Sequence, residues 1–75
     1  MSVFIINPND KYMGIVVSYS KAHKLASELN RLKELTDEEK QITLYTTLKT
    51  YAQKTLTIDE YNKLPIKERP TTNYH

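Results

Sequence analysis

The chain has 75 residues and no cysteine, with 11 Lys and Arg residues against nine Asp and Glu residues, so its formal net charge is +2. This length allows one small domain of marginal stability, and the missing cysteines exclude disulfides, iron–sulfur clusters and thiolate zinc sites. The weak positive charge does not by itself indicate a nucleic-acid-binding protein, and we expect oligomerisation or a larger partner to add stability.

The first predicted element is a β-hairpin at the N-terminus. Two apolar, β-branched segments, 2–6 and 13–19, flank the turn-forming residues Asn7-Pro8-Asn9-Asp10. A loop from Asn7 to Tyr12 would place Ile6 opposite Met13 and Phe4 opposite Ile15.

Both faces of this hairpin are predicted to be apolar, because side chains alternate between faces along a strand. One face would carry Phe4, Ile6, Met13, Ile15, Val17 and Tyr19, and the other Val3, Ile5, Gly14 and Val16. A sheet with one wet face would alternate apolar and polar residues instead. The second face therefore needs a cover, which is either a later segment of the chain, a partner or a second copy.

An amphipathic helix is predicted from Ser20 to about Glu34. Its apolar residues recur at helical spacing, and Ser18 or Ser20 is placed to cap its N-terminus. The apolar stripe consists of Ala22, Leu25, Ala26, Leu29 and Leu32. We expect this stripe to pack on the face of the hairpin that carries Phe4 and Ile15.

The segment 41–51 can be interpreted in two ways. Its four threonines and two tyrosines favour a strand, whereas the preceding Thr36-Asp37-Glu38-Glu39 has the capping-box pattern that starts a helix. A helix would place Leu44, Leu48 and Tyr51 on one stripe. We favour a third strand, entered through a short helical turn at 37–40.

A second capping box, Thr57-Ile58-Asp59-Glu60, predicts a short helix that ends near Leu64, before Pro65. The domain is then predicted to span 1–65, with a polar, flexible tail over 66–75. The predicted fold is a small α+β layer fold of the ββαβα type, with the N-terminal hairpin packed on an amphipathic helix. The alternative is a hairpin followed by two or three helices.

No enzymatic signature is visible, so we expect no catalytic residue, no cofactor and no metal site. Gly14 is the only glycine, which excludes a glycine-rich phosphate loop. His23 and His75 lack the spacing of a metal or catalytic pair. The acidic residues 37–39 and 59–60 fit the positive ends of helices.

The favoured function is a protein–protein interaction module. The uncovered hairpin face and two aromatic anchors would bind a larger protein or form a homodimer. The expected partner-binding residues are Val3, Ile5, Val16, Tyr45 and Tyr51. Small size and a composition rich in Lys, Asn, Thr and Tyr are typical of viral or mobile-element accessory proteins that bind and modulate, or inhibit, a larger host protein.

The alternative function is nucleic-acid binding through a basic helix face. The residues expected to contact nucleic acid are Lys21, Lys24, Arg31 and Lys33. No secretory signal and no membrane-spanning run is visible, so we expect a cytoplasmic protein that does not enter a membrane.

Overall fold

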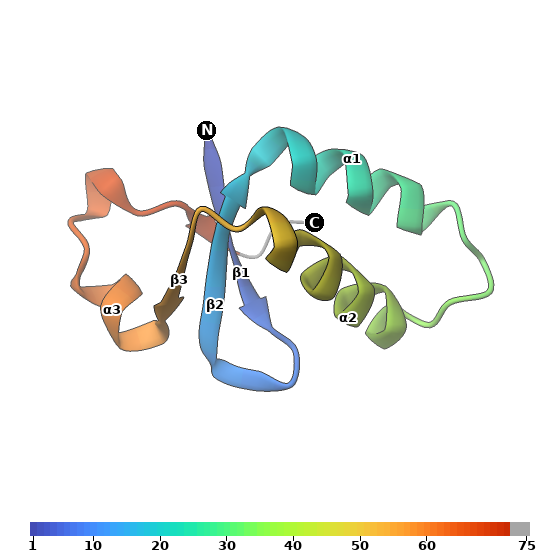
Figure 1. Ribbon diagram of the computed structural model, residues 1–75, viewed down its shortest axis with the longest axis horizontal. Helices are drawn as coiled ribbons and strands as arrows, with labels where there is room; N and C mark the ends of the chain where they lie inside the picture. The colour runs from blue at the N-terminus through green and yellow to red at the C-terminus, as the bar shows by residue number, and fades with distance from the viewer. Residues whose placement is uncertain (73–75) are drawn as a thin grey trace.

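Residues 1–72, which the computed structural model describes, form a small α+β fold with an N-terminal hairpin (Figure 1). The strands and helices are β1 (Ser2–Asn7), β2 (Asp10–Ser18), α1 (Tyr19–Asn30), α2 (Asp37–Leu48), η1 (Lys49–Tyr51), β3 (Lys54–Thr57), α3 (Ile58–Lys63), η2 (Ile66–Glu68) and β4 (Thr71–Thr72), where η denotes a 3-10 helix. The sheet order is β3-β2-β1-β4. Strand β2 is antiparallel to both β1 and β3, and the short β4 runs parallel to β1.

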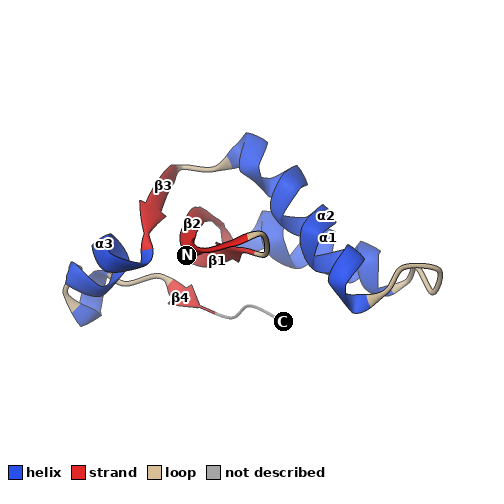
Figure 2. Cartoon of the chain, turned by 90° about the horizontal axis from the view of Figure 1, so that it is seen from below, coloured by secondary structure: helices blue, strands red, loops and turns tan. Residues whose placement is uncertain are grey.

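The helices lie on opposite sides of the sheet (Figure 2). The antiparallel helices α1 and α2 cover one face, and α3 lies on the other. The predicted α+β class is therefore confirmed, with a second helix on the first face and a third strand later in the chain than expected.

The predicted hairpin register is wrong by one residue. Phe4 pairs with Val16 and Ile6 with Gly14, and the pairing shifts between Ile6 and Asn7. The turn is tighter than the expected loop, since the Asn7 side chain accepts a 2.9 Å hydrogen bond from the Asn9 backbone N–H. Residues 11–13 of β2 have no pairing partner in β1, so the irregularity lies within the strand and not in the turn. A one-residue change in register moves each side chain of one strand to the opposite face relative to its partner strand.

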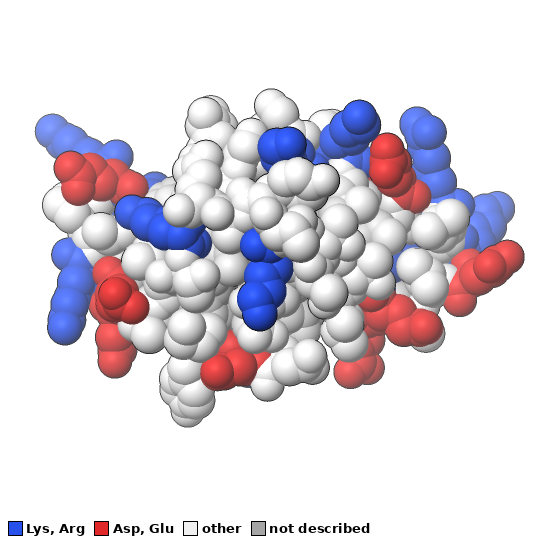
Figure 3. All heavy atoms as spheres, viewed as in Figure 1, with Lys and Arg blue, Asp and Glu red and all other residues white. Residues whose placement is uncertain are grey.

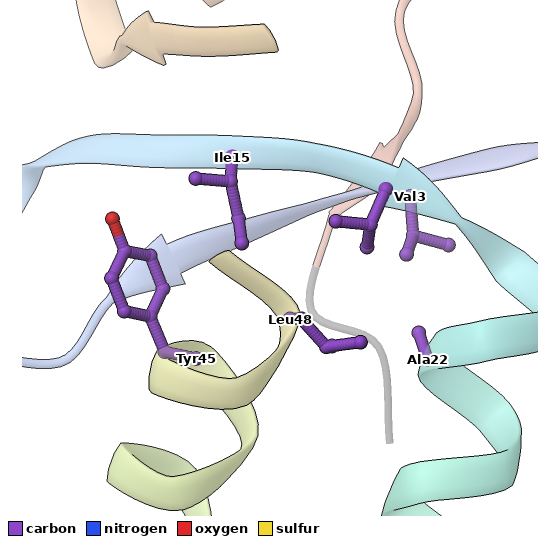
Figure 4. Packing of buried hydrophobic residues seen from close by; sticks show 6 residues of the cluster. Val3, Ile15, Ala22, Tyr45 and Leu48 are labelled. Carbon is purple, nitrogen blue, oxygen red and sulfur yellow. The ribbon is translucent and has the colours of Figure 1, made fainter. Parts of the chain in front are cut away.

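The core lies between the sheet and the α1–α2 pair. Figure 4 shows side chains from both strands of the hairpin pointing toward α1 and α2. The buried cluster consists of Val3, Ile15, Val17, Ala22, Tyr45 and Leu48. The partly buried Ile5, Leu25, Leu44 and Ala52 pack against it.

The true register puts Phe4, Gly14 and Val16 on the sheet face opposite α1 and α2, and the chain's own later residues cover most of this face. The ring of Tyr61, from α3, stacks on Phe4 with 4.5 Å between ring centroids and 18° between planes. Phe4 is 0 % exposed and Val16 3 %. Gly14 makes room for this packing, because a Cβ there would lie 2.4 Å from Cζ of Phe4.

The strand predicted over 41–51 is wrong, because α2 is a helix through Leu48. Thr36 accepts a hydrogen bond from the Glu39 backbone N–H, and Glu39 accepts one from the Thr36 backbone N–H, as in a capping box. Helical spacing also buries Tyr45 and Leu48 on one side. Threonine disfavours a helix by only about 0.5 kcal/mol per residue, so the cap and the buried stripe outweigh it.

The other helix predictions are confirmed with small changes at the ends. The second capping box starts α3 after Thr57. Helix α1 ends at Asn30, four residues before the expected end, and Ser18 is its N-cap residue without a side-chain cap hydrogen bond.

The polar segment after Pro65, predicted as a flexible tail, contacts the domain at several points. The Tyr61 hydroxyl donates to the Pro70 carbonyl, and the Arg69 guanidinium donates to the carbonyls of Leu64 and Asn62. Strand β4 then pairs with Val3 and Phe4 of β1. The flexibility of this segment stays a prediction, and His75 lies outside the described residues.

A candidate binding groove between α1 and η1

An open groove of about 240 Å³ lies between α1 and the end of α2 with η1. Leu25 and Leu48 form its apolar floor, and Tyr51 stands at its edge with 56 % of its surface exposed. The Lys21 ammonium lies 4.4 Å from the centroid of the Tyr51 ring, a cation–π contact that joins the two walls. We call this site the Lys21–Tyr51 groove; it is lined by Lys21, Lys24, Leu25, Glu28, Thr47, Leu48 and Tyr51.

Tyr51 is held on a short, well-anchored turn. After Leu48 the helix tightens into η1, and the Thr50 hydroxyl donates a 2.8 Å hydrogen bond to the Thr47 carbonyl. Two residues beyond Tyr51, the Gln53 backbone N–H donates a 2.7 Å hydrogen bond to the Val16 carbonyl in β2. Tyr51 is therefore only two residues away from a point where the backbone is hydrogen-bonded to the sheet.

The surroundings of the groove are basic. Lys21 and Lys24 lie on its α1 wall with one acidic residue, Glu28, so the lining carries a net positive charge. Figure 3 shows that the charged side chains in the middle of this face, over the ends of α2 and β3, are mostly Lys or Arg, whereas acidic groups gather toward the two ends.

A second hollow, of about 380 Å³, lies where α1 and α2 meet near their connecting loop. Its lining residues are Ala26, Leu29, Asn30, Asp37, Lys40, Gln41 and Leu44. Asp37 and Lys40 give its rim one charge of each sign, and it carries no aromatic side chain. The hollow is larger than the Lys21–Tyr51 groove, but it offers neither a net charge nor an anchor for a ligand.

A metal centre or a shifted pKa outside the groove would mark a further candidate site among the titratable side chains of the described residues. Within residues 1–72, no three His, Cys, Asp or Glu residues are grouped to hold a metal ion. His23 stacks on Tyr19 with 5.8 Å between ring centroids. Hydrogen bonds from the backbone N–H groups of Thr36 and Thr57 lower the pKa of Glu39 and of Glu60. Both shifted groups are capping carboxylates, so the shifts reflect helix starts.

The predicted partner-binding residues do not form one surface. Val3 and Val16 are buried on opposite faces of the sheet, Ile5 packs partly buried against the helix-side core, and Tyr45 lies within that core. Only Tyr51 is exposed. The physical reason is the register, since the expected patch combined side chains that the true pairing separates.

The predicted basic helix face is divided as well. Lys21 and Lys24 line the groove, whereas Arg31 is the C-cap residue of α1 and Lys33 lies in the loop beyond it. Lys24 and Arg31 are seven residues apart, about 10 Å along the helix. Two of the four residues therefore belong to the groove, and the other two lie at the far end of the helix pair.

Each wall of the groove has a signal in the sequence. Lys21 and Leu25 are four residues apart on α1, and Leu48 and Tyr51 are three apart, so each pair shares one side of its helix. The juxtaposition of the two walls comes from tertiary packing.

Comparison with known proteins gives no match: no family model, no curated protein and no solved structure matches the chain. No helix within residues 1–72 combines the length and apolar character that crossing a membrane requires.

Proposed function

We propose that this chain is a non-enzymatic protein-interaction module, which binds and modulates a larger protein through the Lys21–Tyr51 groove. One observation carries the proposal: an exposed tyrosine is fixed on an anchored turn beside an apolar floor. Tyrosine and neighbouring apolar pockets dominate the binding energy of many interfaces. A ring that is already held in place also loses little conformational freedom on binding.

The groove would be the centre of a larger interface. A standard interface buries about 800 Å² of each partner, roughly a seventh of this chain's 5557 Å². The exposed sides of α1 and η1 border the groove and would supply the rim. A homodimer that uses the same surface stays a prediction and is an outcome of the experiment below.

Nucleic-acid binding is the second candidate, because Lys21 and Lys24 lie beside an exposed aromatic ring. The leucine floor and Glu28 favour a protein partner instead, since neither attracts a phosphate backbone. The Lys21 ammonium also lies over the Tyr51 ring, so one of the two faces of the ring is already in contact with a side chain.

The test compares complexes formed by the tagged chain in its source cells. Native mass spectrometry would be applied to the wild type, to Tyr51→Ala and to the control Tyr12→Ala, which removes a 79 % exposed tyrosine from the hairpin. We expect a complex with a larger protein that survives nuclease treatment, persists in Tyr12→Ala and is lost in Tyr51→Ala.

Three outcomes would contradict the proposal. A complex that persists in Tyr51→Ala would place the contact elsewhere. A complex destroyed by nuclease would favour the nucleic-acid function. A species with twice the chain's mass and no other protein would show self-association in place of a larger partner.

A further inference from the structure

We infer that the segment bound in the Lys21–Tyr51 groove carries one large apolar side chain flanked by carboxylates; this inference rests on the proposed function. It names the chemistry of the partner, which the proposed function leaves open.

The floor of the groove defines the apolar part of the ligand. Leu25 and Leu48 come from different helices and meet below a space of about 240 Å³, with the Tyr51 ring at one side. An apolar side chain that enters this space loses its contact with water against two leucines and an aromatic ring. Because the space is open and shallow, it suits a single side chain better than a whole helix.

The charges around the floor define the rest of the ligand. Lys21 and Lys24 are three residues apart on α1, so their ammonium groups lie on the same side of the helix. Each ammonium is a compact charge with three donors, which suits a single carboxylate. Glu28 is the one acidic lining residue, so the two lysines leave the lining with a net positive charge.

Glu28 also gives the groove a direction. It lies one turn of α1 beyond Lys24 and faces the part of the groove away from Lys21. Of the carboxylates that flank the apolar side chain, those at the Lys21 end should therefore contribute most to binding. A ligand with basic residues on both sides of its apolar residue would be repelled by the lysines.

The probe is a fluorescein-labelled pentapeptide of Phe flanked on each side by two Glu residues, and binding is measured by fluorescence anisotropy. Its neutral match has Gln in place of each Glu, and a labelled single-stranded oligothymidylate tests the nucleic-acid alternative. We expect the acidic peptide to bind about tenfold more tightly than the neutral one at low salt. This preference should shrink as salt rises, because exposed charges are screened.

Two double variants isolate the charge. Lys21→Gln with Lys24→Gln should abolish the preference for the acidic peptide. The control Lys11→Gln with Lys67→Gln removes the same charge from exposed sites that do not line the groove, and it should keep the preference. Circular dichroism checks that both variants remain folded, as expected for exposed lysines.

Equal affinities for the two peptides, no binding of either, or tighter binding of the oligothymidylate would overturn the inference. The failure of the inference is separable from that of the proposed function. If Tyr51→Ala abolishes the cellular complex while the peptides bind equally, the groove is an interaction site and only its assigned charge preference is wrong.

Discussion

The two faces of the sheet are covered by different means. On one face, two 12-residue helices bury a cluster of six side chains from four elements. On the other, a six-residue helix contributes the Tyr61 ring, which stacks on Phe4 and is tied to the C-terminal segment by hydrogen bonds. The first cover has helices with their own amphipathic stripes, and the second depends on one aromatic pair and the segment that holds it.

A small domain can therefore cover the second face of its sheet with very few residues. The Phe4–Tyr61 pair buries both its own apolar area and the glycine beneath it. Such a pair contributes about 1 kcal/mol beyond its area. Because the packing on this face depends on one pair of rings, substituting either Phe4 or Tyr61 should remove most of it.

The largest expected effect comes from Phe4→Ala, compared with Leu48→Ala in the other core. Both side chains are buried, with 0 % and 2 % exposure. We expect Phe4→Ala to lower the free energy of unfolding by about 3–5 kcal/mol and Leu48→Ala by about 2–5 kcal/mol, measured by urea denaturation. A loss below about 1 kcal/mol for Phe4→Ala would show that the α3 side is not packed in solution.

The second prediction concerns Gly14→Ala, which should destabilise the fold by about 1–3 kcal/mol. The added Cβ would lie 2.4 Å from Phe4 Cζ and 2.9 Å from the Ile5 carbonyl oxygen. Combining it with Phe4→Leu should recover part of the loss, because the ring is the main obstacle. Strictly additive losses in this double-mutant cycle would contradict the close approach.

The third prediction compares the two capping boxes. Thr36→Ala and Thr57→Ala should each cost about 1 kcal/mol. Hydrogen exchange should separate them: Thr57→Ala should expose amides throughout α3, which has only six residues, whereas Thr36→Ala should affect only the first turn of α2. Equal and local changes in both variants would mean that tertiary contacts alone hold α3.

The smallest effect is a dependence of stability on pH. The pKa values of Glu39 and Glu60 are lowered by hydrogen bonds from the capping threonines, so the unfolded chain binds protons more readily than the folded one. Stability from these groups is therefore present above the ordinary glutamate pKa and lost as pH falls below about 4.5 through the lowered values. Urea denaturation from pH 6 to pH 3 should show a shallower decline for Glu39→Gln with Glu60→Gln. An unchanged slope would contradict the assignment.

Local signals in the sequence predicted much of the fold. Short stretches of sequence are enough to predict the hairpin, the apolar stripe of α1 and both capping boxes. The hairpin register was not predictable in this way, because it depends on how the chain turns at Asn7–Asp10 and where β2 takes up its extra residues. This single difference led to the wrong faces, and therefore to a binding patch at Val3 and Val16 that the true fold buries.

The remaining errors arise from tertiary context. Strand β3 has a short, polar sequence, and its pairing with Met13–Val16 defines it. The threonines of α2 favour a strand by propensity, but the burial of Tyr45 and Leu48 on one side of a helix outweighs this preference. The walls of the groove are each visible in the sequence, but only the packing of α1 against α2 brings Lys21 to Tyr51.

The parallel pairing of β4 with β1 has a consequence for synthesis on the ribosome. Val3 is translated long before its strand partner Thr71, because the two residues lie far apart in the sequence. The outer edge of β1 therefore stays unpaired in the nascent chain until β4 has emerged from the ribosome. An unpaired strand edge is a template for pairing with other chains, so the growing polypeptide is exposed to aggregation through β1 until β4 emerges.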